Sequence, residues 1–304
     1  GCTEGESLSG RIESFGEAVM MNQKMKTRGR KDLRGLLWIL PSFLGVSVLY
    51  LLPYLDVFRR SFTGAVDEQF AGLNNYRNVL GNTAFLLALK NTLRFTLVCI
   101  PILILASLLC AILLSGSKYG GIIKSAFLMP MALPAVSVAL LWRLLFHSQG
   151  LANQWMGRLG MEGSDWMNTG KAFWILVASY IWRNLGYDII LWMAGLSGIS
   201  ESIYEAARVD GAGEWQCFLR ITLPNLKSSL YTITVLSFLN SFKVFREAYL
   251  VAGNYPHESI YMMQHLFNNW FQSFSFDKLS AAAVMEGGVL LFAILLLQKV
   301  WRMD

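Results

Sequence analysis

Polar and ionisable side chains interrupt two of the long apolar runs in this chain of 304 residues. Such groups are costly inside a membrane, where they line a ligand path or pair with one another. The groups that we select as a substrate path are Arg183, Asn184, Asp188, Asn240, Lys243 and Glu247. Asn184 and Asp188 are four residues apart, and so are Lys243 and Glu247, which places each pair on one helix face. Amides and carboxylates can hydrogen-bond to the hydroxyl groups of a sugar.

Aromatic rings accompany these groups in the fourth apolar run. The rings that offer flat faces to the apolar side of a sugar are Trp182, Tyr187 and Trp192. The alternative is that the charges pair across a helix bundle, for instance Lys243 or Arg246 with Glu286, and touch no ligand. The residue types leave both interpretations open.

The pattern of reactive residues excludes several classes of enzyme. The four cysteines and three histidines lack the spacing of a metal site, and no Ser/His or paired-Asp set lies in the apolar runs. The phosphate-binding sequence G-x-x-x-x-G-K-[ST] does not occur in the chain. We therefore expect a protein that is not an enzyme, with no catalytic residue, no metal and no cofactor of its own.

The composition is that of a protein with several membrane spans. Hydrophobic residues make up 54% and charged residues 15% of the chain, and its mean hydropathy is +0.43. Six stretches are long enough to cross about 30 Å of hydrocarbon as helices: 35–55, 85–114, 122–146, 172–196, 228–249 and 280–300. Pro130 and Pro134 should end or kink the third. The expected class is an all-α polytopic membrane protein with six transmembrane helices.

Basic residues in the loops predict the orientation of these spans. If the N-terminus is cytoplasmic, fourteen Lys and Arg residues lie inside and six lie outside. Both termini should therefore face the cytoplasm. Residues 1–34 form a basic tail, whose run KMKTRGRKDLR is an orientation signal and a lipid contact and not a nucleic-acid site. We expect the native start at Met20, Met21 or Met25 and give residues 1–24 no structural weight.

A polar island, EAARVDGAGEWQCFLRITLP, separates the fourth and fifth apolar runs. Ser202 followed by Glu205 is a capping-box pattern, which predicts a short helix over residues 203–209. Gly211 supplies a position for positive φ, and GEWQCFLRIT predicts a second helix. Two short helices at a bend would form a rigid knob for docking another protein. The alternative is an amphipathic loop on the lipid headgroups.

The island resembles the signature loop of a known family. E-A-A-x-x-D-G-A followed by F-x-x-I-x-L-P is similar to the cytoplasmic loop in permease subunits of bacterial binding-protein-dependent ABC importers. The matching residues are Glu205, Ala206, Ala207, Asp210, Gly211, Ala212, Phe218, Ile221, Leu223 and Pro224. Four further stretches resemble the sugar-importing branch, which contains maltose-type and glycerol-phosphate-type permeases: FAGLNNYRNVL, Asn91-Thr92, KSAFLMPMALPAVSVALLWRLLF and LSFLNSFKVF. The resemblance covers residues 35–300.

The resemblance implies the type I permease fold of ABC importers. Residues 35–83 would hold the first transmembrane helix and an external segment, and residues 84–304 a core of five more helices with the coupling loop 200–226. In this family the coupling helix of that loop sits in a cleft on the ATPase subunit. The implied contacts are Glu205, Ala206, Ala207, Asp210, Gly211 and Ala212. ATP and Mg would be bound by those partner ATPases. A second permease, in a heterodimer, and an extracytoplasmic solute-binding protein are the other expected partners.

The sequence also departs from the family pattern near the fifth run. SFKVFREAYLVAGNYPHES stands where relatives have SFKVFD and a Gly-rich stretch, which leaves the substrate open. We expect import of a mono- or oligosaccharide across the bacterial cytoplasmic membrane by alternating access. The alternatives are an ABC permease for an amino acid, peptide or polyol phosphate, and an ion-coupled secondary transporter that needs no docking knob.

The segment HESIYMMQHLFNNWFQSF follows Pro256 and has apolar residues at nearly helical spacing. These are Ile260, Met263, Leu266, Phe267, Trp270 and Phe271. We expect this external segment to pack against the bundle; contact with a binding protein is the alternative.

Overall fold

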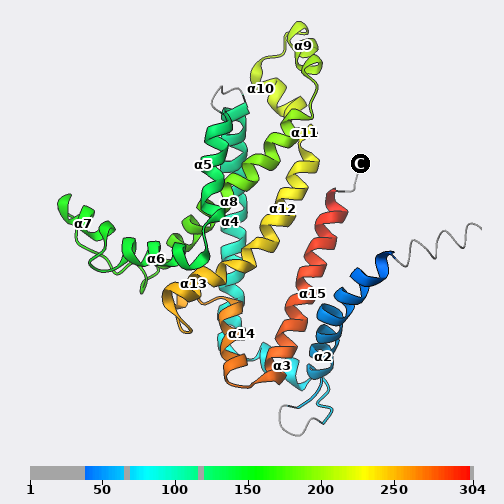
Figure 1. Ribbon diagram of the computed structural model, residues 1–304, viewed down its shortest axis with the longest axis vertical. Helices are drawn as coiled ribbons and strands as arrows, with labels where there is room; N and C mark the ends of the chain where they lie inside the picture. The colour runs from blue at the N-terminus through cyan, green and yellow to red at the C-terminus, as the bar shows by residue number, and fades with distance from the viewer. Residues whose placement is uncertain (1–37, 65–68, 116–119, 302–304) are drawn as a thin grey trace, which may run out of the picture. The chain divides into compact units, whose positions relative to one another are not determined.

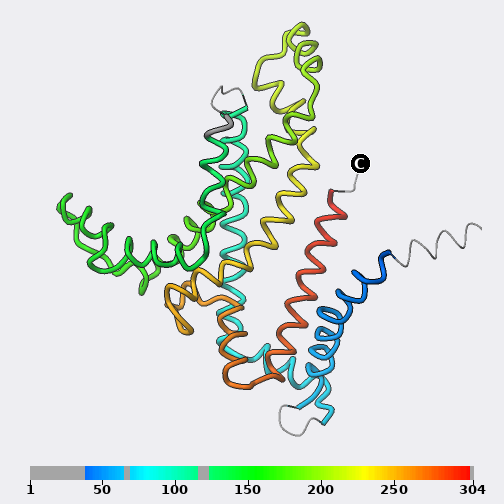
Figure 2. Tube along the Cα trace, in the orientation of Figure 1, coloured from blue at the N-terminus to red at the C-terminus, as the bar shows by residue number. Residues whose placement is uncertain are grey.

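The computed structural model describes residues 38–64, 69–115 and 120–301 (Figures 1 and 2). The described residues form helices and connecting loops, with one isolated β-bridge between Thr63 and Phe70. The expected all-α class is confirmed. The predicted basic tail, residues 1–34, lies outside the described residues.

The helices follow one another closely along the chain. Their bounds are η1 Ser47–Leu51, α2 Leu52–Arg60, α3 Asn74–Leu80, α4 Thr83–Ser115, α5 Gly120–Ala132, α6 Ala135–Phe146, α7 Leu151–Arg158, α8 Lys171–Ser197, α9 Glu201–Val209, α10 Glu214–Cys217, η2 Phe218–Thr222, α11 Leu223–Asn225, α12 Lys227–Ser241, η3 Phe242–Val244, α13 Phe245–Ala252, η4 Glu258–Ile260, α14 Met263–Gln272 and α15 Phe276–Trp301. The chain divides into two units, one up to Arg59 and one from Arg60 onward.

Both π-helical turns in the described residues end two positions before a proline. In η1 the N–H of Leu52 bonds to the carbonyl of Ser47, and Pro53 follows. In η2 the N–H of Leu223 bonds to the carbonyl of Phe218, and Pro224 follows. Proline has no N–H, and its ring clashes with the carbonyl four residues earlier. A turn with i→i+5 bonds widens the helix at that place, so the helix continues past the proline.

The core of the second unit forms where α4 packs along α8 and α12 packs against both. Near one end of α8, Phe95 of α4 contacts Phe173 and Tyr180 edge to face, with ring centroids 6.5 and 5.5 Å apart. Near the other end, Trp192 is buried with Ile233 of α12. These aromatic and branched side chains fix how α8 and α12 face each other.

Small residues allow the closest helix contacts. An ideal Cβ built on Gly186 of α8 would overlap the carbonyl of Phe127 in α5, and one on Gly195 would overlap the Oγ of Ser229 in α12. Lipid tails are as apolar as the surfaces of membrane helices, so the hydrophobic effect does not draw these helices together. They associate instead where small residues allow their backbones to approach closely. Glycine at these positions therefore sets the spacing of α5, α8 and α12.

The third predicted span is not one straight helix. The chain bends by 95° between α5 and the helices that begin at Ala135. Leu133 precedes Pro134, which has φ −58° and ψ 142° and no N–H to continue the helix. The stretch 122–146 is therefore not one continuous helix, and the expected kink lies at the second of the two prolines that predicted it. Figure 1 shows α6 running away from the end of α5.

Three described helices are long and apolar enough to cross a membrane, Trp38–Arg60, Thr83–Ser115 and Phe276–Trp301, and the bent pair would make a fourth. The predicted fourth span, α8, has 27 residues but carries Lys171, Arg183 and Asp188. The predicted fifth is α12, with 15 residues, continued through the 3₁₀ turn η3 into α13. The site described below lies between the charged part of α8 and the break between α12 and α13.

The segment that follows Pro256 is fastened to α4 by two adjacent side chains. The Asn91 amide donates to the carbonyls of Glu258 and Tyr261, at 2.5 and 3.0 Å. The Thr92 hydroxyl accepts from the N–H of Met263 at 3.1 Å. The segment then forms α14, which buries Met263, Leu266 and Trp270, as its apolar spacing predicted.

His265 of α14 is completely buried. Its Nδ1 accepts from the N–H of Met262 at 3.2 Å, and its ring meets Phe245 edge to face at 4.7 Å. Burial lowers the pKa of His265 to about 4, so the ring is neutral at physiological pH. It is a packed core residue.

Candidate functional site

The polar island folds into two short helical arms joined by a tight turn, here called the knob (residues 201–222). Its first arm, α9, begins at Glu201, with Ser200 in the extended N-cap position. The predicted capping box of Ser202 and Glu205 is wrong, because the helix starts earlier and Ser202 lies inside its first turn. The Ser202 hydroxyl is 2.8 Å from that of Ser200. Glu201 at the start and Arg208 at the end have charges that suit the helix dipole.

Gly211 makes the turn, as the sequence predicted. Its φ is +83°, a conformation that L side chains rarely adopt. The N–H of Gly211 bonds to the carbonyl of Arg208, and that of Ala212 bonds to the carbonyl of Ala207, at 3.0 and 2.9 Å. These bonds satisfy the last carbonyls of α9 and reverse the chain.

The second arm, α10 and η2, returns toward the bundle. Gln216 caps it by accepting from the N–H of Gly213 at 3.2 Å. Two interactions join the arms: Tyr204 and Thr222 share a 2.8 Å hydrogen bond between hydroxyls, and Arg208 lies 3.3 Å from the carboxylate of Glu214. Cys217 is buried. The knob is thus a closed unit at the ends of α8 and α12 (Figure 1).

The surface of the knob combines polar and apolar groups. Of the six predicted ATPase contacts, four are exposed and two, Ala207 and Ala212, are half-buried; the exposed four are Glu205, Ala206, Asp210 and Gly211. Val209 is 87% and Trp215 69% exposed. Large apolar side chains that remain exposed on a rigid unit are suited to contact with another molecule.

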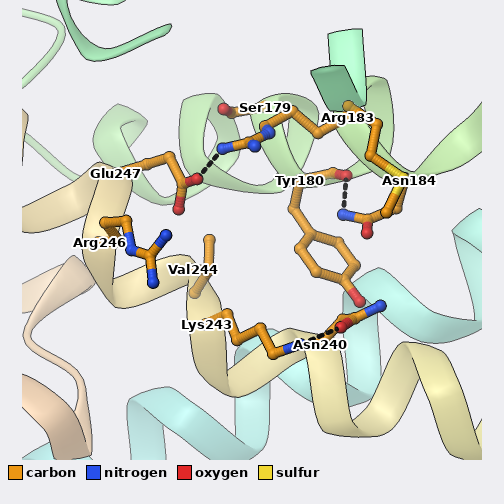
Figure 3. Close-up of a pocket in the computed structure, with 10 residues that line it drawn as sticks. Ser179, Tyr180, Arg183, Asn184, Asn240, Lys243, Val244, Arg246 and Glu247 are labelled. Carbon is orange, nitrogen blue, oxygen red and sulfur yellow. Dashed lines mark hydrogen bonds and ion pairs between the residues drawn. The ribbon is translucent and has the colours of Figure 1, made fainter. Parts of the chain in front are cut away.

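Five of the six predicted substrate-path residues line one cavity of about 180 Å³ between α8 and the junction of α12 with α13. The lining is Met131, Ser179, Tyr180, Arg183, Asn184, Asn240, Lys243, Val244, Arg246 and Glu247. Figure 3 shows Arg183, Asn184, Tyr180, Lys243, Arg246 and Glu247 around a common space. We call this cavity the pocket.

Hydrogen bonds fix the walls of the pocket. Arg183 and Glu247 form an ion pair, in which both side chains are mostly buried. Lys243 donates to the amide oxygen of Asn240 at 2.9 Å. The Tyr180 hydroxyl donates to the carbonyl of Ser237 at 2.7 Å, which holds α8 against α12.

Lys243 and Glu247 meet different partners, although they are four residues apart. Lys243 donates to Asn240, three residues earlier, while Glu247 reaches across to Arg183 of α8. The 3₁₀ turn Phe242–Val244 lies between these two contacts along the chain. In the alternative interpretation the charges pair across the bundle. Arg183 and Glu247 do pair in this way, whereas no pairing of Lys243 or Arg246 with Glu286 occurs among the described residues.

Asp188 and Glu286 do not line the pocket. Asp188 is 2% exposed and accepts a 3.1 Å hydrogen bond from Ser237, so it joins α8 to α12. The buried Oε1 of Glu286 in α15 has no hydrogen-bond partner within the part of the chain that the structure describes.

The aromatic residues expected near the path lie elsewhere too. Trp192 is buried and donates to Ser107 at 3.0 Å, and Trp182 packs on Trp142. Tyr187 is absent from the lining. The ring that does line the pocket belongs to Tyr180, which sequence reasoning missed. Its spacing of three and four residues from Arg183 and Asn184 was the available signal.

Residues 103–298 match the family described as the binding-protein-dependent transport system inner membrane component. Over 227 residues, 72% of each chain, the sequence is 36% identical to the arabinooligosaccharides transport system permease protein AraP of Bacillus subtilis. It is 29% identical over 288 residues to the trehalose/maltose transport system permease protein MalF of Thermococcus litoralis, covering 92% of this chain and 98% of that one. The fold matches a chain of a bacterial ABC transporter involved in the import of the acidic polysaccharide alginate, with a TM-score of 0.79 and 21% sequence identity. The match covers 90% of this chain and 96% of that one.

Proposed function

The chain belongs to the family of binding-protein-dependent transport system inner membrane components, and from this premise we propose that it forms part of the path by which an importer moves a carbohydrate across the cytoplasmic membrane. The resemblance inferred from the knob sequence is confirmed. The curated relatives described above are named as permeases for arabinooligosaccharides and for trehalose and maltose, which supports a mono- or oligosaccharide as the substrate. With the family established, an ion-coupled carrier is no longer a candidate.

The knob supports the proposed mechanism. It is a closed unit with a fixed bend at Gly211 and exposed apolar side chains at Val209 and Trp215. We expect it to occupy a cleft on a cytoplasmic ATPase subunit, with contacts from Glu205, Ala206, Ala207, Asp210, Gly211 and Ala212. A rigid knob passes a movement of the ATPase to α8 and α12, the helices that line the pocket.

The remaining partners follow from this role. ATP and Mg would bind to the ATPase subunits, a solute-binding protein would deliver the carbohydrate from outside, and both termini of this chain would be cytoplasmic. The pocket is smaller than the about 300–1,000 Å³ of a complete small-molecule site. A second permease would supply the other wall and make a heterodimer.

A pair of glycine substitutions tests the role of the knob. Gly211 and Gly213 both have open space around the position of a Cβ, but only Gly211 has a positive φ. In a reconstituted importer, Gly211→Val should lower carbohydrate uptake at least tenfold while ATP hydrolysis continues, because the strained turn displaces the arms. Gly213→Val, whose φ of −75° suits valine, should keep most of the uptake.

Equal uptake by both variants, with normal coupling to ATP hydrolysis, would show that the bend at Gly211 does not transmit the movement. Recovery of the Gly211→Val complex in normal amounts is the control for folding, and it should be measured on the same preparations.

A further inference from the structure

The pocket contains more positive than negative charge. Three cations, Arg183, Lys243 and Arg246, and one carboxylate, Glu247, line it. The ion pair between Arg183 and Glu247 accounts for one charge of each sign. Lys243 and Arg246 therefore leave the pocket with two positive charges that no carboxylate in its lining balances.

Within the described residues, neither of these two cations has an ion pair of its own. Glu247 also interacts electrostatically with Arg246, but this carboxylate is already paired with Arg183. Lys243 bonds to Asn240, whose amide oxygen is an acceptor without net charge. Arg246 makes no hydrogen bond or ion pair among the described residues, and both side chains are exposed. In Figure 3 the guanidinium of Arg246 extends into the space that Lys243 and Glu247 border.

Lys243 and Arg246 lie toward one end of their span. Lys243 is sixteen residues beyond Lys227, the first residue of α12. At about 1.5 Å per residue it is about 24 Å along a path through roughly 30 Å of hydrocarbon, and thus about 6 Å from the far boundary. At this position the two charges can receive an anion that enters from that side.

The rest of the lining is neutral and does not offset the positive charge. Ser179 accepts a hydrogen bond from Trp142, the Tyr180 hydroxyl donates to the carbonyl of Ser237, and the Asn184 amide donates to the carbonyl of Tyr180. Lys243 and Arg246 are therefore the polar groups of the pocket that are exposed to a ligand. The cavity has the volume of about six water molecules, at about 30 Å³ each, so one part of a carbohydrate can enter it.

We propose that the carbohydrate carried by this importer bears an anionic group, such as the carboxylate of a uronic acid, and that Lys243 and Arg246 bind this group in the pocket. The inference rests on the proposed function, since it names the chemical class of the same substrate. Lysine and arginine recognise a carboxylate by charge-assisted hydrogen bonds, and arginine can do so through two parallel bonds.

Uptake of matched sugars tests the proposal. Cells with the complete importer would receive trigalacturonate or trimannuronate, or the neutral trimers of galactose or mannose. We expect uptake of a uronate trimer that requires this subunit. The double variant Lys243→Gln with Arg246→Gln should reduce it about tenfold, equivalent to about 1.4 kcal/mol. Lys299→Gln, the same change at an exposed lysine near the end of α15, should have no effect.

Uptake restricted to neutral trimers would overturn the inference and leave the proposed function intact. Uptake of no carbohydrate at all would overturn the proposed function, and the inference with it. Normal uronate uptake by the double variant would show that another site binds the anion.

A chemical probe measures the charge of the pocket without knowledge of the substrate. Met131 lines the pocket and is 42% exposed, so Met131→Cys in an otherwise cysteine-free chain provides a thiol there. In the assembled importer, the anionic sulfonatoethyl methanethiosulfonate should react at least about tenfold faster than its cationic trimethylammonioethyl analogue, because positive potential concentrates anions. The double glutamine variant should bring the two rates together. Equal rates in the parent would mean that a partner subunit neutralises the cations, which would overturn the proposal.

Discussion

The knob and the pocket differ in the distance along the chain that their contacts cover. In the knob, Arg208 pairs with Glu214, six residues away, and the longest bond, between Tyr204 and Thr222, covers 18 residues. In the pocket, the ion pair of Arg183 with Glu247 covers 64 residues. A local turn can thus be encoded by neighbouring residues, whereas the pocket depends on how whole helices pack.

Breaking the ion pair of the pocket should have the largest effect. Glu247→Met or Arg183→Met leaves one mostly buried charge without its partner, and removing one member of a buried pair costs about 3–5 kcal/mol. The double variant removes both charges and should recover most of that stability. The stability of the three variants is measured by thermal unfolding of the assembled complex. A double variant as unstable as the single ones would show that the two charges do not stabilise the fold by pairing with each other.

The helix contact behind the pocket should be the next most sensitive. Gly186→Ala places a methyl group against the backbone of Phe127, and forcing extra volume into a packed contact costs about 1–3 kcal/mol. Gly288→Ala makes the same change in α15, where nothing lies within 4 Å, and should be neutral or slightly stabilising. The two variants are compared by measuring the stability of their complexes in detergent. Equal stability would mean that α5 and α8 are not held at this spacing.

The smallest effect should come from the knob. Tyr204→Phe removes the hydroxyl that bonds to Thr222 and should cost about 1 kcal/mol. The loss should be confined to residues 201–222, because the bond joins only the two arms. Hydrogen exchange of this segment, compared with that of α8, measures the effect. Faster exchange throughout α8 would contradict the view that the knob is a separate local unit.

The sequence predicted the knob well because its signals are local. The positive φ of Gly211 and both arms followed from residue types within a few positions of the bend. The capping box failed for an equally local reason: two serines lie close together, and the helix begins at Glu201 with the earlier one, Ser200, in the N-cap position. The sequence pattern alone does not show which of two serines so close together takes the N-cap position.

The pocket could be predicted only in part. Polar residues inside apolar runs identified Arg183, Asn184, Asn240, Lys243 and Glu247, but the sequence did not assign their partners. The packing of α8 on the α12–α13 junction brings Arg183 to Glu247, and the packing of α8 on α12 brings Asp188 to Ser237. Neither effect leaves a periodic signal in the sequence.

The sequence by itself determined that this protein is a helical membrane protein with a bent polar knob, because hydropathy and glycine conformation act over short stretches of chain. The tertiary structure decided that the third predicted span is broken and that Glu247 meets Arg183. It also decided that Lys243 and Arg246 lie beside a cavity without an ion pair among the described residues. These outcomes depend on contacts between distant helices, whose spacing is set by close packing at residues such as Gly186.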